Sequence, residues 1–315
     1  MGGPTGPVPG RPPSAQPRPL YRRWWLSAGV ALLLVVVIAV LNRPVPSVTP
    51  SVTPSVTPSV TTSGSPSPTE PAGPILVGSS FGGSGVRNIQ ATAALFPTAR
   101  VGRFYFPTDP APYGTSVLTS IPAGQVIFVS FKTAVATVAS GAYDATFKTV
   151  LASWNASGRT IYWTWQHEAD DPGKGINPAD YVAGWNHLLS VEAAEPSPNV
   201  HSMTVLMAFA LTAGQPHGNP DSWYVPRVDV LGFDSYQLYT EKLAEAYAAS
   251  KGKRLAFPEF GDGTAAGRTD AQGLAFAQAF YGALTPDVFA AVWFNAGVNK
   301  LHVRPLTLAY LKSLT

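Results

Sequence analysis

The sequence predicts an α/β fold over residues 75–315, a (β/α)8 barrel of the TIM type. Eight short apolar runs, rich in β-branched and aromatic residues, recur through this region, and segments with helical periodicity lie between them. Most of these runs are apolar at consecutive positions, as are strands that are covered on both faces. Strand–helix alternation repeated eight times over about 240 residues fits such a barrel in count and in size.

The predicted strands follow one another at intervals that leave room for a helix after each. They cover Ile75–Phe81, Val101–Phe106, Gln125–Lys132, Thr160–Glu168, Met203–Ala210, Val228–Tyr236, Arg254–Gly261 and Phe289–Gly297. One helix is predicted from Pro178, where Asn177 is a good cap and apolar residues then recur three and four positions apart. A similar pattern covers Asp270–Leu284, whereas the first three repeats have the weakest helical patterns.

An apolar segment, residues 24–41, precedes the barrel. It is an uncharged run of 18 residues, close to the roughly 20 that span a bilayer as a helix. Two arginines stand before it and two tryptophans begin it, which is typical of a membrane interface. We therefore expect a transmembrane anchor with residues 1–23 as a disordered cytoplasmic tail and the C-terminal domain outside the cell. A cleaved signal peptide, which would make the protein secreted, is the alternative.

Residues 42–74 are rich in Pro, Ser, Thr and Val. The tetrapeptide Ser-Val-Thr-Pro recurs from Ser47, Ser51 and Ser55, a composition that cannot bury a core. Prolines stiffen such a segment into a spacer of ~3 Å per residue, which could reach on the order of 90 Å. The sequence therefore predicts a disordered linker that carries the barrel away from the membrane.

The charge distribution and the absence of cysteine exclude several classes of function. Five of the 21 Lys and Arg residues and one of the 18 Asp and Glu residues lie within residues 1–72, which leaves 16 basic and 17 acidic residues and a net charge of −1 in the remainder. No basic stripe is left there for nucleic acid. The chain has no cysteine for disulfides, thiol catalysis or zinc–thiolate sites. Because motifs for zinc and dinucleotides are also incomplete, we expect no metal and no cofactor.

Glu168 and Glu259 are the strongest candidates for catalysis. Each ends a predicted buried strand, where a carboxylate is costly unless it has a role. Because the active site of such a barrel gathers at the C-terminal ends of its strands, the fourth and seventh strands could bring the two carboxyls together. Acid/base cleavage of a glycosidic bond needs such a pair.

Four motifs resemble glycoside hydrolase family 26, of clan A. They are Trp-Gln-His-Glu168 on the fourth strand, Gly232-Phe-Asp-Ser-Tyr236 on the sixth, Pro258-Glu-Phe-Gly261 on the seventh and Val292-Trp-Phe-Asn295 on the eighth. The resemblance covers roughly residues 75–315. It implies that Glu259 is the nucleophile of a retaining double displacement, that Glu168 is the acid/base, and that Tyr236 hydrogen-bonds the nucleophile. It also implies an aromatic sugar platform on the eighth strand, for which Trp293 is the candidate.

Further residues are candidates for substrate contact. His167 could hydrogen-bond the nucleophile or a sugar hydroxyl, or be a structural histidine. Lys132 and Arg103 could bind sugar hydroxyls or pair with the carboxylates, or lie at the surface. Asp234 shares the facing of Tyr236 and could equally make a buried structural hydrogen bond. Asn295 and Trp165 complete the set, although regular alternation would place Trp165 and Glu168 on opposite faces of their strand.

The sequence therefore predicts a membrane-anchored, extracellular, retaining β-glycoside hydrolase that is endo-acting on a polysaccharide or oligosaccharide. Gln166, and a loop after Glu168 that lacks an aromatic-rich stretch, depart from the family pattern and put mannan in doubt. Xylan, mixed-linkage glucan and wall polymers stay open beside it. The alternatives are a non-catalytic, carbohydrate-binding barrel displayed at the cell surface, and an enzyme of another class on the same barrel.

Overall fold

The computed structural model describes residues 73–315, apart from 83–84, 111–113, 196, 213, 215–217 and 264–267. The predicted cytoplasmic tail, the membrane anchor and nearly all of the linker lie outside the described residues. Within the described part of the chain, no helix combines the length and the apolar character needed to cross a bilayer.

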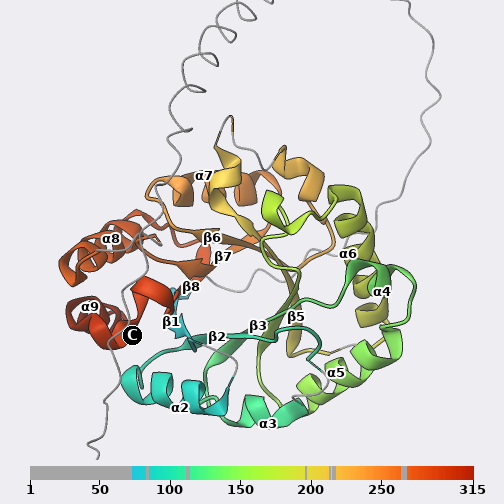
Figure 1. Ribbon diagram of the computed structural model, residues 1–315, viewed down its shortest axis with the longest axis horizontal. Coiled ribbons are helices and arrows are strands. Elements are labelled where there is room, and N and C mark those ends of the chain that lie inside the picture. Colours follow the sequence, from blue (N-terminus) through green and yellow to red (C-terminus); the bar gives the residue numbers. More distant parts are fainter. Residues whose placement is uncertain are drawn as a thin grey trace, which may run out of the picture. The chain divides into compact units, whose positions relative to one another are not determined.

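The described strands form a closed parallel barrel in chain order, surrounded by helices (Figure 1). They are β1 (Leu76–Ser80), β2 (Val101–Tyr105), β3 (Val126–Phe131), β4 (Ile161–Trp165), β5 (Val200–Met207), β6 (Val230–Ser235), β7 (Arg254–Phe260) and β8 (Val288–Trp293). The predicted (β/α)8 barrel is confirmed. Most of the predicted runs contain their strand, but β5 and β8 begin earlier than predicted, and β4 ends three residues before Glu168.

The outer layer is mostly α-helical. It contains α2 (Val86–Leu95), α3 (Gly114–Thr119), α4 (Val135–Ala139), α5 (Asp144–Ala156), α6 (Pro178–Ala193), α7 (Thr240–Ser250), α8 (Asp270–Ala283) and α9 (Pro305–Ser313). The Asn177 side chain caps α6 by accepting from the Ala179 N–H at 2.8 Å, as predicted. Between β5 and β6 the described residues form two short 3-10 turns, Ala208–Leu211 and Pro220–Trp223, in place of an α-helix.

The interior of the barrel is closed by an apolar cluster that spans most of the strands. Side chains of a strand point alternately to its two faces, so every second residue enters the barrel. The cluster contains Val101, Phe128, Tyr162, Met203, Val205, Val230, Ala256, Phe289, Ala290 and Val292. A second and larger cluster fills the space between the barrel wall and the helices. The inward-facing residues that follow Val101 and Phe128 along their strands are therefore available to form a site above the apolar cluster.

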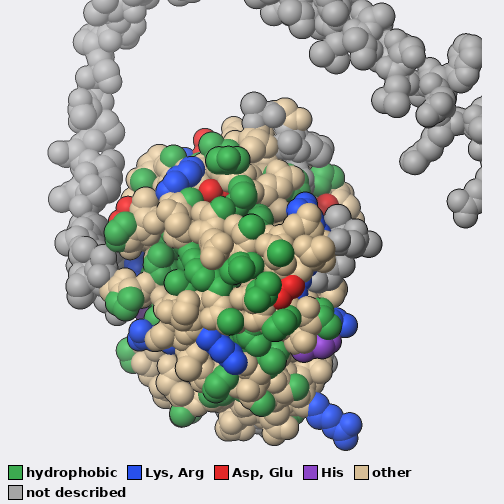
Figure 2. All heavy atoms as spheres, turned by 90° about the vertical axis from the view of Figure 1, so that its left-hand side faces the viewer, with side chains coloured by type: hydrophobic (Ala, Val, Ile, Leu, Met, Phe, Trp, Pro, Cys, Tyr) green, Lys and Arg blue, Asp and Glu red, His purple; other side chains and the backbone are tan. Residues whose placement is uncertain are grey.

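Lys and Arg side chains lie singly on the face of the domain that carries α8 and α9. Figure 2 shows them among hydrophobic and uncharged side chains, and no continuous basic band crosses the described residues of this face. Such a surface offers no evident path for a phosphate backbone.

Candidate active site

A cavity of about 950 Å³ opens at the C-terminal ends of the strands. Residues at or just beyond the ends of all eight strands line it, among them Ser80, Tyr105, Lys132, His167, Glu168, Met207, Tyr236, Glu259 and Phe294. Both glutamates predicted from the sequence thus face one cavity, although β4 and β7 are not neighbours in the barrel. This is the end of such a barrel at which active sites form.

Glu259 enters the cavity because β7 contains an irregularity. Gly232 on β6 is paired with Ala256 on β7, but Asp234 is paired with Glu259, so β7 has one residue more than β6 over this stretch. In a regular strand, residues three positions apart, such as Ala256 and Glu259, point to opposite faces. The extra residue places them on the same face. Pro258 lies within the irregular stretch, where its missing N–H costs no ladder hydrogen bond.

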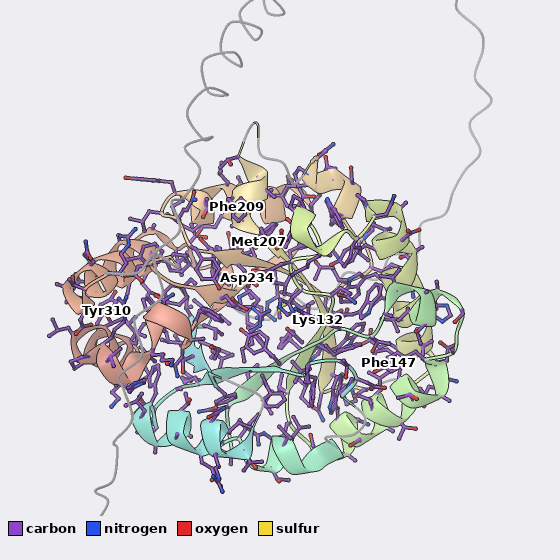
Figure 3. All side chains as sticks on the ribbon, in the orientation of Figure 1. Lys132, Phe147, Met207, Phe209, Asp234 and Tyr310 are labelled. Atoms are coloured by element: carbon purple, nitrogen blue, oxygen red, sulfur yellow. The ribbon has the colours of Figure 1, made fainter. Side chains whose placement is uncertain are left out.

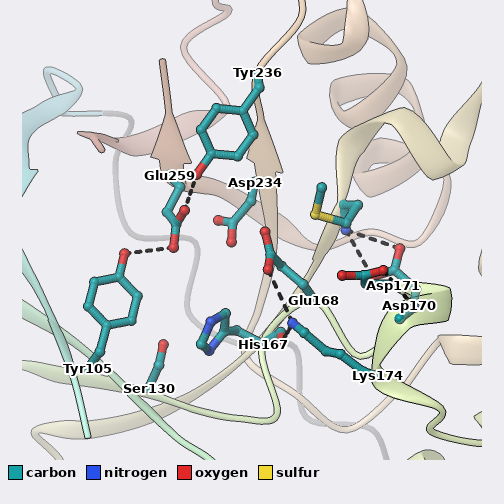
Figure 4. Close-up of polar contacts among 12 residues, drawn as sticks. Tyr105, Ser130, His167, Glu168, Asp170, Asp171, Lys174, Asp234, Tyr236 and Glu259 are labelled. Carbon is teal, nitrogen blue, oxygen red and sulfur yellow. Dashed lines mark hydrogen bonds and ion pairs between the residues drawn. The ribbon is translucent and has the colours of Figure 1, made fainter. Parts of the chain in front are cut away.

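Two tyrosine hydroxyls (Figure 4) and the guanidinium of Arg103 surround the carboxylate of Glu259, whose side chain is 5% exposed. The Tyr105 hydroxyl donates to one oxygen at 2.6 Å, and the Tyr236 hydroxyl donates to the other. Arg103 Nη1 lies 3.2 Å from the first oxygen. Burial, and then the negative charge of Glu259, raise the pKa of Tyr236 far above its usual range. Burial also raises the pKa of Tyr105, so both hydroxyls keep their protons and remain donors.

Arg103 and Asp234 form a buried ion pair beneath this carboxylate. Arg103 Nη1 is 2.8 Å from Asp234 Oδ1, both side chains are fully buried, and Arg103 Nη2 donates to the Ser130 hydroxyl at 3.2 Å. Burial raises the pKa of Asp234, and the charge of Arg103 opposes that rise. Burial lowers the pKa of Arg103, but the charges of Asp234 and Glu259 outweigh this and raise it overall. Of the two roles open for Asp234, the structure thus shows the buried structural one.

Replacing Arg103 with Met should destabilise the barrel. The change leaves two buried carboxylates without their cation, and breaking a buried ion pair by removing one partner costs about 3 kcal/mol or more. The midpoint of denaturant unfolding should fall accordingly in R103M. The exposed α2 residue Arg87 offers a matched control, and R87M should unfold like the unmodified chain. Equal stability of the two variants would contradict the role assigned to Arg103.

Glu168 reaches the cavity through a left-handed turn after β4. Gln166 and Glu168 both have a φ of 53°, a conformation that is uncommon for residues other than glycine. The Gln166 side chain is anchored by donating to the Thr133 carbonyl oxygen at 2.9 Å, and the Glu168 N–H donates to the Val205 carbonyl oxygen at 2.8 Å. The turn ends the regular alternation of β4, which lets Glu168 face the cavity although Trp165 faces outward.

The carboxyl groups of Glu168, Asp234 and Glu259 lie close together, with one oxygen of each within 4.8 Å of the others. Lys174 Nζ lies 3.1 Å from a Glu168 oxygen and also donates to the His167 carbonyl oxygen at 2.6 Å. Such a carboxylate group could in principle hold a cation. Arg103 already supplies positive charge between Asp234 and Glu259, so the donor set favours hydrogen-bonded carboxylates over a metal centre.

His167 lines the cavity beside Tyr105, with ring centroids 5.6 Å apart. Burial, reinforced by the positive charges of Arg103, Lys132 and Lys174, lowers the pKa of His167 well below 6.5. The imidazole is therefore neutral near pH 7. Its Nδ1 is buried and has no hydrogen-bond partner within the described residues.

Two tryptophans that were candidates for sugar stacking lie outside the barrel wall. Trp165 stacks on Tyr181 of α6, with ring centroids 5.9 Å apart, and its Nε1–H donates to the Thr133 carbonyl oxygen. Trp293 packs against Phe260, and its Nε1–H donates to the Asn299 carbonyl oxygen. Both side chains are fully buried, so neither can meet a sugar in the cavity. Alternation along each strand explains their positions.

Phe294, the residue after Trp293, lines the cavity in its place and packs edge-on against Tyr236 at 5.9 Å. Asn295 lies behind it and fixes the loop after β8. Its side chain accepts from the Leu301 N–H at 2.8 Å, and its own N–H donates to the Ser80 hydroxyl at 2.9 Å. The predicted substrate contact by Asn295 thus finds no support in the lining of this cavity.

Of the predicted site residues, the structure brings Glu168, Glu259, His167, Tyr236 and Lys132 to one cavity. The sequence analysis missed Tyr105, Lys174 and Phe294. A usable signal existed for Tyr105 and Phe294, because each stands two positions after an inward-facing residue of the same strand, Arg103 and Val292. Lys174 gave no such signal, since its position depends on the fold of a loop.

Neither the family models nor the curated proteins contain a match to this chain. Solved structures do match it. The family 26–family 5 endo-β-mannanase/endo-β-glucanase of Prevotella bryantii aligns over 75% of this chain with a TM-score of 0.55 and 14% identity. A family 5 xyloglucan-specific endo-β-1,4-glucanase from a metagenomic library aligns over 76% of this chain and 97% of its own, with a TM-score of 0.55 and 12% identity.

Cel5A of Thermotoga maritima aligns over 75% of this chain and 97% of its own, with a TM-score of 0.51 and 10% identity. The fold is that of the (β/α)8 glycoside hydrolases. The alignment covers 43% of the Prevotella protein, so this chain spans less than half of that protein's length. At these identities the likeness establishes the barrel architecture, and the chemistry has to be argued from the cavity itself.

Proposed function

We propose that this chain is a retaining β-glycoside hydrolase. The observation that carries the proposal is the distance between its two candidate carboxyls, with an oxygen of Glu168 within 4.8 Å of an oxygen of Glu259. Retaining enzymes hold their two carboxyl groups about 5–5.5 Å apart, whereas inverting enzymes leave roughly 6.5–9.5 Å for a water molecule. The short distance favours direct attack by a carboxylate on the sugar.

The surroundings of the two glutamates support different roles. Glu259 is nearly buried, accepts hydrogen bonds from Tyr105 and Tyr236 and forms an ion pair with Arg103, an arrangement that suits a carboxylate held in one orientation for attack. Glu168 is the more exposed, at 20% against 5% for Glu259, and its only ion pair within the described residues is with Lys174. A proton carrier must exchange with solvent between steps, which suits Glu168.

The geometry supports a double displacement. In the first step, a Glu259 oxygen bonds to the anomeric carbon while the bond to the leaving oxygen breaks, and that oxygen takes the proton of Glu168. In the second step, Glu168 takes a proton from water, the water oxygen bonds to the anomeric carbon, and the bond to Glu259 breaks. The stereochemistry inverts twice and is retained overall. Tyr105, Tyr236 and Arg103 hold Glu259 throughout.

The size and shape of the cavity favour a polymeric substrate. It is an open volume of about 950 Å³ lined in part by the half-buried Phe209 and Phe294, which offer apolar faces to sugar rings. The matched structures from Prevotella and the metagenomic library are named as endo-acting enzymes on β-linked polysaccharides. We therefore propose endo-action on a β-linked polysaccharide. An open cavity with adjacent carboxyls speaks against the non-catalytic carbohydrate-binding alternative.

The anomer of the first product tests this function. Full-length protein incubated with a panel of mannan, xylan and glucan oligosaccharides should release a product that is initially the β-anomer, followed by proton NMR before mutarotation. A 2-deoxy-2-fluoro glycoside should label Glu259, with the site located by peptide mass spectrometry. Initial release of the α-anomer, or a label on another residue, would contradict the proposed mechanism.

Replacing Tyr236 with Phe should lower kcat by roughly 10- to 100-fold, because a hydrogen bond to a charged group is worth about 1.5–3 kcal/mol. Steady-state kinetics on the best substrate of the panel measure the loss. Tyr310 of α9 lies away from the cavity lining and gives a matched control, so Y310F should keep full activity. An unchanged kcat in Y236F would remove Tyr236 from the set of residues that hold Glu259.

We also propose that residues 24–41 anchor the enzyme in the membrane with the barrel outside the cell. The support is the uncharged apolar run, its flanking arginines and the proline-rich spacer. Full-length protein expressed in cells should sediment with membranes and resist extraction by alkaline carbonate. N-terminal sequencing decides against anchoring if the recovered protein begins after Leu41, as it would after signal cleavage.

A further inference from the structure

Lys132 stands directly after β3 and faces the cavity. Phe128 and Ser130 on the same strand point into the barrel, the first in its apolar cluster and the second against Arg103, and Lys132 continues this alternation. It lines the cavity together with Glu168 and Glu259, and its side chain is exposed to it. Figure 3 labels it among the side chains of the barrel, inside the ring of helices.

The ammonium group of Lys132 has no hydrogen bond or ion pair within the described residues, although its backbone N–H donates to the Thr108 carbonyl oxygen at 2.9 Å. Of the other cations, Arg103 contacts Asp234 and Lys174 contacts Glu168, whereas the exposed Arg268 lines the cavity from the segment before α8. Burial, and then the positive charge of Lys174, lower the pKa of Lys132. Lys132 is thus a partly desolvated cation, which Lys174 and Arg103 repel and the carboxylates of Glu168 and Glu259 attract.

The proposed reaction removes one of the negative charges that face Lys132 and Lys174. Glu168 must carry a proton to cleave the bond, and a protonated Glu168 no longer neutralises Lys174. Asp171 also lines the cavity, where its carboxylate accepts from the Gly173 N–H at 2.9 Å, and the positive charge of Arg268 on the same lining offsets its negative charge. His167 is neutral and adds no charge. An anionic group bound beside Lys132 would restore local balance at the stage when the acid form of Glu168 is needed.

We propose that Lys132 binds the carboxylate of an acidic sugar, so that the substrate is a β-linked glycan containing uronate residues. A bond from an ammonium to a carboxylate is roughly twice as strong as one between neutral groups. A uronate differs from its parent hexose only in carrying a carboxylate in place of a hydroxymethyl group, so it fits the same cavity. The proposal rests on the proposed function and names the substrate class of the same site.

Binding of matched oligosaccharides tests this without turnover. The probes are cellotetraose and its C6-oxidised tetraglucuronate, and mannotetraose and β-1,4-tetramannuronate, titrated calorimetrically at low and high salt into full-length protein in which Glu259→Gln removes the proposed nucleophile. In at least one pair the acid should bind about 10-fold or more tightly than the neutral sugar, with a preference that shrinks in salt. The preference should disappear in Lys132→Gln and persist in Lys132→Arg.

The outcomes separate this proposal from the proposed function. If the acidic oligosaccharide binds more tightly than the neutral one, and this difference is lost in K132Q, the uronate site is supported even if no glycan is cleaved. Equal or weaker binding of both acids, no binding of any probe, or a preference that survives in K132Q overturns it. Cleavage of neutral glycans alone, with the β-anomer released first, would leave the hydrolase standing while the uronate site fails.

Discussion

Glycan hydrolysis should be lost in Glu259→Gln. The amide keeps the size of the carboxylate but cannot attack the anomeric carbon, and removing a nucleophile lowers kcat by on the order of 10⁴-fold or more. The fold should survive, because Arg103 keeps its 2.8 Å partner Asp234 and one buried negative charge is removed. Initial rates on the best substrate of the panel, measured alongside the unfolding midpoint, check both statements.

Glu195 provides the matched control for this substitution. It lies on the surface, 42% exposed and 3.8 Å from Lys148, so E195Q should retain full activity and stability. Turnover by E259Q at a tenth or more of the normal rate would sink the assignment of Glu259 as nucleophile. Loss of activity together with unfolding would be answered with Glu259→Asp, which keeps the charge but shortens the reach of the carboxylate.

Glu168→Gln should have an effect that depends on the leaving group. On a polysaccharide the leaving oxygen needs a proton, and loss of a general acid/base lowers kcat by about 10²–10⁴-fold. The dinitrophenolate of a dinitrophenyl glycoside leaves without protonation. The first step of the reaction with this substrate should therefore proceed in E168Q. Because the second step still needs a base, a burst of dinitrophenol followed by slow turnover is expected in stopped-flow measurements.

Asp180 in the exposed first turn of α6 serves as the control, and D180N should behave like the unmodified chain with both substrates. An equal loss on polysaccharide and on dinitrophenyl glycoside, without a burst, would contradict the acid/base role. The leaving-group dependence thus distinguishes Glu168 from a residue that merely binds sugar.

Much of the fold was predictable because burial on both faces leaves a strong signature in sequence. β3 and β7 are nearly continuous apolar runs, and their predicted bounds differ from the observed ones by one residue at most. The fourth strand is predicted to extend to Glu168, but β4 ends at Trp165. Gln166 and His167, which follow it, are also buried, so burial does not mark the end of the strand. The left-handed turn at Gln166 depends on its bond to the Thr133 carbonyl oxygen, a contact between separate strands that no local pattern contains.

The candidate site was predictable in its carboxylates and less so in its aromatic residues. Glu168 and Glu259 stand out because charge at the end of an apolar strand is rare. The resemblance on the eighth strand names Trp293 as the sugar platform, whereas alternation from the inward-facing Val292 points to Phe294. The contact between Lys174 and Glu168 could not be predicted, since the position of the ammonium group depends on how the loop after β4 folds.

The position of the tryptophans has a spectroscopic consequence. All six within the described residues are buried, and none lines the cavity: Trp154, Trp163, Trp165, Trp185, Trp223 and Trp293. Trp163 and Trp185 stack between the barrel wall and α6, with ring centroids 4.8 Å apart. Indole emission from this part of the chain therefore follows the detachment of helices from the barrel, and it should stay nearly constant when the cavity fills.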